Sequence, residues 1–589
     1  MYRSLMLFCA ATVCVLLPGC KKDEDGMRFS IFTETFNRSA KVEIDSIASS
    51  WRVGDQVWVN GQTGVVEIVN NNSVLTMDEA VDNWNRNYYA AYPASMVTSG
   101  NQNGELTISL PQIYQYDEDE STQRQLLELP MVATTTNDQI AFKHLTGALV
   151  VKVPSVDRNI VLDYVMVQSS TTALSGTGTV NMNRDADNPQ VTFGADTTHT
   201  VIMFFDEHPV TISSGASTTK DIMIPIAPTS GENHQFTVTV RAHTQDSPYL
   251  YYLFNRKSTV GNMARNEVGV APVPRLPEGH FVGQGTEANP YLIQNKEDYK
   301  HFVRCVTNNI QSVCTAYLKM TNDIFFGGET ITTAAGFFRG DFNGEGKTLR
   351  NVVVKAQYMS ACTAYVLSIF PPVSAGRIRN LNVKDVSFYC QSMNDPVYIG
   401  GLTACIKGPE SNISFENITV SNIASTTTYS QHTYRVCAGG YVGRIERRSG
   451  GTTSYSIMMN NCVYSQQNTR QCIFDVISCG SFSYGGIAGV ADGVKIELED
   501  FTINFDGSAS LPGVNLNAHT NPAYVGSLFG ALMNSTITYQ LTLEVKGYLA
   551  FSGTNSSNVA RLIGYNSNST LIEGINDSGL SFLKNGTGI

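Results

Sequence analysis

Acidic side chains are the residues of the C-terminal half that could do chemistry. A glycosidase or polysaccharide lyase needs two carboxylates at a fixed separation, or carboxylates that hold a metal beside a basic proton acceptor. The acids beyond residue 360 are scattered, and only Glu416 and Glu499 fall at similar positions of the sequence repeats described below. The pattern predicts no catalytic residues, so we do not expect an enzyme.

Cysteines and histidines predict no metal site either. The nine cysteines from Cys305 onward include no C-x-x-C pair and no Cys/His spacing typical of zinc. Cys305 and Cys314 are the one local pair that could form a disulfide. We expect buried thiols that act as small hydrophobic side chains, with no metal and no cofactor.

Two other polar features favour structural roles. His144 lies alone inside the apolar run 142–149, which is typical of a packing histidine. The acidic run 117–120 lacks the turn glycine and ligand spacing of a calcium loop, so we expect a solvated loop.

Cys20 has the clearest chemical role. Arg3 precedes a short apolar run, and Leu17-Pro18-Gly19-Cys20 follows it. This order is typical of a secretory signal peptide, here residues 1–19, and is too short for a membrane span. The last four residues resemble a bacterial lipobox. The resemblance implies that the Cys20 thiol is acylated, with chains such as palmitate, and becomes the mature N-terminus.

The residues after Cys20 give the expected location. Lys21-Lys22-Asp23-Glu24-Asp25, within a lipidated tether of residues 20–26, resembles the acidic export signal of Bacteroidetes surface lipoproteins. A solvated charged tether is the alternative. No later stretch reaches the roughly 20 apolar residues of a spanning helix. We therefore expect a protein held in the cell outer membrane by its lipid and exposed at the cell surface.

Composition narrows the class of protein. Charged residues make up 15% of the 589 residues, against about 25% in ordinary globular domains. Residues 27–271 carry 15 basic and 26 acidic residues, which accounts for the net charge of −11, whereas residues 272–589 carry 22 of each. These values exclude a disordered acidic chain, a coiled coil and a basic nucleic-acid binder, so no nucleic-acid partner is expected.

Residues 27–270 predict an all-β fold of short alternating strands. The length suggests two tandem β-sandwiches, at 27–155 and 156–270. Asn60-Gly61 predicts a tight hairpin, because both residues tolerate positive φ. The segment 271–279 holds three prolines in six positions and predicts a stiff linker.

Four segments in this region carry a family resemblance. They are Trp51–Val57, Tyr89–Ala94, Leu129–Ala133 and Phe142–Leu149. In this order they resemble the fimbrillin-like proteins of Bacteroidetes. The resemblance implies two transthyretin-like β-sandwiches in a lipoprotein precursor of a fimbria or surface adhesin. It also implies proteolysis after an arginine, for which Arg38 is the candidate, and strand donation between fimbrial subunits.

Residues 280–589 contain two alternating repeats. One is a small–apolar–x–small motif, as in Gly401-Leu402-Thr403-Ala404. The other is a polar residue followed by an apolar strand, and it begins at Asn351, Asn380, Asn417, Asn461, Asp500 and Gln540. A constant order with variable spacing predicts one unit per coil of a parallel β-helix of about six coils, with asparagines stacked at the corners. A propeller is the alternative.

The entry to the repeats also resembles a family. Gly283–Ile293 and Phe338–Leu349 resemble the start of glycine-rich, GLUG-type β-helix repeats of Bacteroidetes surface proteins. Between them, 296–306 predicts a short capping helix. Such proteins are implicated in adhesion, which the fold alone does not establish.

The leading functional expectation is a non-enzymatic surface adhesin or fimbrial tip or accessory protein. Its β-helix would present the surface that binds a host protein or glycan. The alternatives are a surface glycan-binding protein for nutrient uptake and a β-helix polysaccharide lyase or hydrolase. The aromatic residues that could stack on sugars are Tyr429, Tyr434, Tyr455 and Tyr484.

Overall fold

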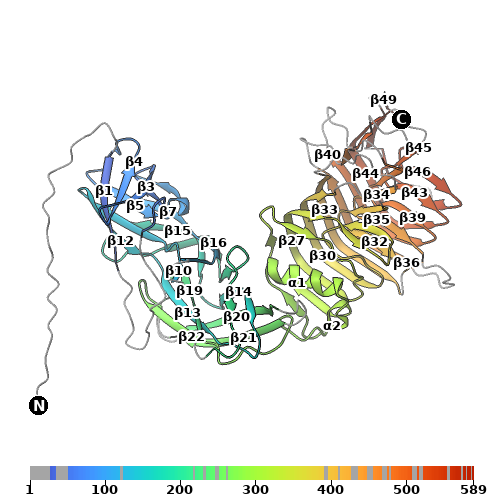
Figure 1. The fold of residues 1–589 in the computed structure, drawn as a ribbon. Helices are drawn as coiled ribbons and strands as arrows, with labels where there is room; N and C mark the ends of the chain where they lie inside the picture. The colour runs from blue at the N-terminus through green and yellow to red at the C-terminus, as the bar shows by residue number, and fades with distance from the viewer. Residues whose placement is uncertain are drawn as a thin grey trace, which may run out of the picture. The chain divides into compact units, whose positions relative to one another are not determined.

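The computed structural model confirms the all-β prediction, with 61% strand and 4% helix. The chain forms two compact units, Met1–Gly279 and His280–Ile589, coloured blue to green and green to red in Figure 1. The structure describes residues 27–34, 51–119, 124–216, 219–229, 234–245, 251–260, 263–390, 395–408, 411–425, 435–447, 456–466, 474–475, 479–506, 514–516, 522–553, 558–571, 575–578, 580–584 and 587–588.

Seven strands of the first unit close into a barrel in the order β1-β12-β11-β5-β2-β3-β4. Phe29 and Ile31 of β1 lie in its core, together with Val57 and Phe142. Both Asn60 and Gly61 have positive φ at the β2–β3 turn, which confirms the predicted hairpin. The barrel strands are β1 (Met27–Thr33), β2 (Gln56–Val59), β3 (Gln62–Val69), β4 (Asn72–Met77), β5 (Tyr88–Tyr92), β11 (Met131–Thr135) and β12 (Gln139–His144).

Two facing sheets form the part of the first unit that follows the barrel. One has the order β19-β13-β22 and the other β21-β20-β14-β17-β8, with an apolar core between them. β13 falls within the range 27–155 but pairs only with β19 and β22, whose residues lie after 156. The strands are β8 (Ile113–Gln115), β13 (Gly147–Val153), β14 (Ile160–Ser169), β17 (Thr200–Phe204), β19 (Lys220–Ile226), β20 (His234–Thr244), β21 (Tyr251–Val260) and β22 (Val268–Pro272).

A third sheet draws strands from both parts of the first unit. β7 (Glu105–Leu110) and β6 (Val97–Gly100) pair with β15 (Ser175–Asn181) and β16 (Thr192–Thr198) in the order β16-β15-β7-β6. The parts are therefore joined by backbone hydrogen bonds as well as by the chain.

The proline-rich segment 271–279 is not a free linker. Its first two residues extend β22, and Val273 and Leu276 are buried in the core of the facing sheets. The backbone N–H of Gly279 donates to the carbonyl of Tyr251 at 2.9 Å.

The second unit is a parallel β-helix, as predicted, and it is built from three sheets (Figure 1). Each coil contributes one long strand and one or two short ones. The long strands are β27 (Asp341–Lys355), β30 (Gly376–Tyr389), β33 (Ile413–Ser425), β36 (Ser456–Gln466), β40 (Lys495–Asp506) and β44 (Thr536–Gly553). The short ones are β29 (Ala364–Leu367), β31 (Val397–Gly400), β34 (Arg435–Gly439), β38 (Ser481–Gly485), β42 (Ala523–Val525) and β45 (Asn558–Val559) in one sheet. The other sheet holds β32 (Thr403–Lys407), β35 (Val442–Glu446), β39 (Ala488–Asp492), β43 (Phe529–Met533) and β46 (Ile563–Ser567).

Left-handed asparagines bend the long strands. Asn380, Asn417 and Asn461 have φ between 49 and 53°, a conformation that asparagine tolerates better than most residues. Their side chains form the predicted ladder, because Asn461 donates to Asn417 at 2.8 Å and Asn417 to Asn380 at 2.9 Å. Asn351 is out of register with this row, since β27 and β30 align it with Asp385. The ladder continues instead through Asn343, which accepts from Asn380 at 3.0 Å.

The small–apolar–x–small motif marks the corner between the two short sheets. Its apolar residues Leu402, Tyr441 and Ile487 are fully buried. A Cβ added at Gly401 or Gly440 would lie 2.1 or 2.3 Å from the carbonyl oxygen of the next coil. Small residues recur here because successive coils leave no room for a side chain.

A helix covers the first coil. α1 (Lys296–Thr307) matches the predicted capping helix, and the Asn295 side chain accepts hydrogen bonds from Glu297 and Asp298 at its N-terminus. Phe302 of α1 packs its ring against Phe342 of β27 at a centroid separation of 5.5 Å. Next to it lie α2 (Gln311–Cys314), β23 (Tyr291–Ile293), β24 (Tyr317–Met320) and β25 (Ile324–Phe325).

We expect Gly440→Ala to destabilise the β-helix by about 1–3 kcal/mol, because the new methyl group would overlap the Gly486 carbonyl at 2.3 Å. Thermal unfolding followed by circular dichroism measures this. Gly194→Ala is the control, since its nearest neighbour would lie at 3.6 Å. Equal melting temperatures for the two variants would contradict the stacking argument.

Candidate functional site

The outer face of the long-strand sheet carries an unusual group of cations. Phe325, Arg350 and Lys384 lie side by side on successive strands, and we call these three residues the basic row. The Arg350 guanidinium lies over the Phe325 ring at 5.2 Å, and this ring is 50% exposed. Arg350 and Lys384 are exposed, and neither forms an ion pair within the described part of the chain.

Neighbouring cations of the same face are neutralised. Arg379 pairs with Asp341 at 3.2 Å, and Arg377 pairs with Glu416. Asp385 follows Lys384 in the chain, and its carboxylate accepts a hydrogen bond from Asn422 at 2.9 Å. The basic row thus holds two cations that form no ion pair within the described residues, which suits an anionic ligand.

Glu416 and Glu499 do not form a catalytic pair. Asn460 of β36 separates them in register, so they lie two coils apart. Burial acts to raise the pKa of Glu416, but hydrogen bonds from Arg377 and Ser414 outweigh it and leave the pKa below its usual value. A general acid needs the opposite shift, so Glu416 is not suited to that role.

The predicted sugar-stacking tyrosines do not form a described site. Tyr484 is fully buried, and its hydroxyl lies 3.2 Å from that of Tyr464, so its assignment as a ligand-facing residue is wrong. The alternating pattern of β38 places this side chain inside the coil. Tyr429, Tyr434 and Tyr455 lie outside the described residues, as do Cys20 and Arg38.

A hydrogen-bonded clasp holds the end of β1 in the first unit. The Glu34 carboxylate accepts from the backbone N–H of His144 at 2.6 Å and pairs with Arg265. The His144 ring is 1% exposed and contacts the Glu34 carbonyl at 3.1 Å. Burial is the main cause that lowers the pKa of His144 to about 4. The predicted packing role of His144 therefore includes fixing β1.

Two acids of the run near residue 117 form ion pairs within the described part of the chain. Asp117 pairs with Arg52 at 3.0 Å and with His208 at 3.3 Å, and Glu118 pairs with Lys220 at 2.7 Å. Arg52, Asp117 and His208 line a groove of about 380 Å³.

The described cysteines of the second unit form no disulfides. All eight are buried, which fits the expectation of small hydrophobic side chains. Burial raises the pKa of Cys390, Cys462 and Cys479 to about 12. Cys314 forms no disulfide with Cys305 but directs its thiol toward the Cys305 carbonyl at 4.0 Å.

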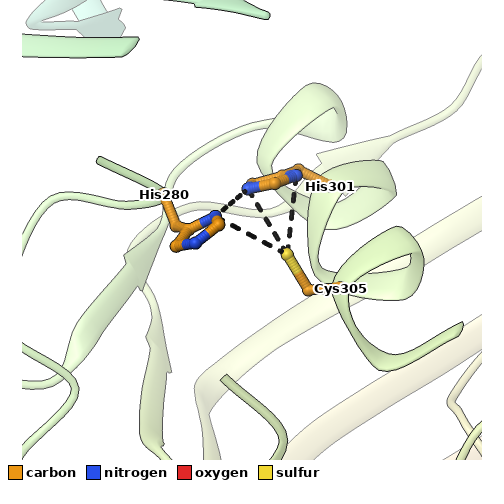
Figure 2. A group of neighbouring side chains, drawn as sticks. All are labelled: His280, His301 and Cys305. Carbon is orange, nitrogen blue, oxygen red and sulfur yellow. Dashed lines mark hydrogen bonds between the residues drawn. The ribbon is translucent and has the colours of Figure 1, made fainter. Parts of the chain in front are cut away.

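One cluster of potential metal ligands was not predicted. Figure 2 shows His301 and Cys305 on α1, with His280 facing them from the segment before it. The Nδ1 of His280 lies 3.2 Å from the Nε2 of His301, and the Cys305 sulfur lies 3.5 Å from that Nε2. The four-residue spacing on a predicted helix was a usable signal for two of these ligands. His280, 21 residues earlier, required the fold.

We expect His144 to make stability pH-dependent. Its pKa is about 4 in the folded chain and about 6.5 when unfolded, so between these values the unfolded chain binds more protons. Stability should therefore fall as pH drops from 6.5 to 4, by up to about 3 kcal/mol. Urea unfolding of His144→Gln should show a weaker loss over this range. The exposed His199→Gln is the control, and identical pH profiles for both variants and the parent would contradict the assignment.

Comparisons with known proteins leave the family open. No described helix is both long and apolar enough to cross a membrane. No family model matches the sequence, and no curated protein matches it. Among solved structures, it is similar to a "putative cell adhesion protein" from Bacteroides ovatus ATCC 8483. The identity is 14%, the match covers 43% of this chain and 95% of that one, and the TM-score is 0.26. A similarity at this level carries no argument about fold or function.

Proposed function

We propose that the protein is a non-enzymatic, lipid-anchored adhesin of the cell surface. The observation that carries the proposal is the basic row, in which two cations without an ion pair among the described residues lie beside a half-exposed ring on a parallel sheet. A β-helix fixes the spacing of such groups at about 4.8 Å per coil, which suits a ligand with regularly repeated charges.

The ligand class that this row favours is an acidic glycan. Arg350 and Lys384 supply donors for carboxylate or sulfate groups, and Phe325 supplies an apolar ring face. A role in glycan capture for nutrient uptake would use the same residues. Attachment of whole cells to a glycan-coated surface distinguishes adhesion from uptake, because uptake alone requires no attachment.

The position of β1 supports a fimbrial role as a tip or accessory subunit. β1 closes the barrel between β4 and β12 and precedes Arg38. Cleavage after Arg38 would leave β1 held only by its hydrogen bonds, its packing and the Glu34 clasp. Its loss would open two strand edges, to which a strand donated by a partner could add.

Removing the cations of the basic row should weaken glycan binding. For the double variant Arg350→Ala/Lys384→Ala we expect affinity for a sulfated dextran to fall at least about tenfold, because two charge-assisted hydrogen bonds are lost. Surface plasmon resonance at two salt concentrations measures this. Lys546→Ala is the control. Lys546 is in register with Lys384, four coils away, and is paired with Glu544 at 3.0 Å. The assignment would be contradicted if neutral dextran bound as tightly as sulfated dextran, or if Lys546→Ala lost as much affinity as the double variant.

Surface display and processing can be tested together. Protease treatment of intact cells should release β-helix peptides.

Mass spectrometry of the mature chain should find an acylated Cys20 or a new N-terminus at Ser39. Cys20→Ala should abolish anchoring, and Arg38→Ala should block the cleavage that creates the new N-terminus. Protection of the chain until lysis would rule out the adhesin role.

A further inference from the structure

We propose that His280, His301 and Cys305 form a zinc-binding site at the start of the β-helix. The site is separate from the basic row and does not depend on an adhesive function. Each side chain offers one ligand atom, and the three atoms lie within 4.8 Å of one another. Two imidazole nitrogens and one thiolate make a borderline-soft ligand set that suits Zn²⁺.

The distances between the ligand atoms match those that zinc requires. Bond lengths of about 2.05 Å to nitrogen and 2.3 Å to sulfur place tetrahedral ligands about 3.3 Å (N–N) and about 3.6 Å (N–S) apart. The corresponding separations here are 3.2 Å between His280 Nδ1 and His301 Nε2, and 3.5 and 3.9 Å from the Cys305 sulfur to His301 Nε2 and His280 Nδ1. The ligands are thus close to the geometry of an occupied site.

The fold holds two of these ligands rigidly. His301 and Cys305 are four residues apart on α1, so they point to the same side of the helix (Figure 2). They are 1% and 3% exposed, and the Phe281 ring packs on His301 at 4.8 Å between centroids. His280 is only partly buried, which gives an ion access and leaves a fourth coordination position for water.

The sulfur needs a small adjustment to bind the metal. The sulfur lies at similar distances from both nitrogens of the His301 ring, 3.5 Å from Nε2 and 3.7 Å from Nδ1. To share a metal ion with Nε2 it would have to move away from Nδ1. Binding would form one Zn–S and two Zn–N bonds, and the thiol proton would pass to solvent. The proton shared by His280 and His301 would move to the other nitrogen of the ring that donates it, so that both metal-binding nitrogens are free and each neutral ring keeps one N–H.

The consequence of zinc binding would be a fixed cap on the β-helix. α1 covers the first coil through Phe302, whose ring contacts both Phe338 and Phe342. A metal bridging His280 to α1 would hold the entering chain against this cap. Because zinc would bind the folded site and not the unfolded chain, it should raise the stability of this unit.

The test uses the full chain, stripped of metal with a chelator and titrated with Zn²⁺ against a chromophoric competitor. We expect one tight site per chain, a higher melting temperature, and a thiolate-to-cobalt charge-transfer band when Co²⁺ replaces zinc. Cys305→Ser should abolish the band and weaken zinc binding at least about tenfold. His280→Ala should weaken binding similarly, and its partly exposed side chain makes misfolding a small risk.

Cys314→Ser is the matched control, because Cys314 is a buried thiol nine residues away that is outside the cluster. It should keep the zinc stoichiometry, the band and the metal-dependent melting temperature. Circular dichroism establishes that each variant is folded. Absence of stoichiometric zinc binding by the parent chain, or unchanged binding in folded Cys305→Ser and His280→Ala, would overturn the site.

Discussion

The close stacking of successive coils is the constraint on which the second unit depends. Parallel strands lie about 4.8 Å apart, so each corner must turn within the thickness of a single chain. Glycine meets this requirement at Gly401 and Gly440, where a Cβ would collide with the next coil. Asparagine meets it at Asn380, Asn417 and Asn461, where left-handed φ values coincide with a side-chain amide ladder.

This stacking also determines what the surface can present. Once corners are in register, the residues between them form straight rows, apolar inside and polar outside. Val383, Val420 and Ile503 belong to one inner row and are fully buried. Arg350 and Lys384 lie on an outer row, where adjacent like charges are tolerated because both side chains reach solvent. The proposed binding face thus arises from the same regularity that builds the core.

Both units solve the problem of exposed strand edges, but in different ways. In the first unit β1 completes a closed ring, and its end is fastened by Glu34 to His144 and Arg265. In the second unit α1 covers the first coil. In both cases a short segment near the start of the unit protects a sheet that could otherwise add a strand. The proposed cleavage and the proposed metal ion would act on these two segments.

The sequence by itself determined the all-β class, the β-helix, its capping helix and the Asn60-Gly61 hairpin, because each depends on local periodicity or on φ preferences of single residues. The predictions for Tyr484 and for Asn351 as the first member of the ladder were wrong. The direction of a side chain and the register of a strand depend on the neighbouring coils. Only the tertiary structure decided that β13 joins the later sheets and that His280 meets His301 and Cys305. Those arrangements bring together residues that are distant in the chain, and local sequence patterns do not predict such contacts.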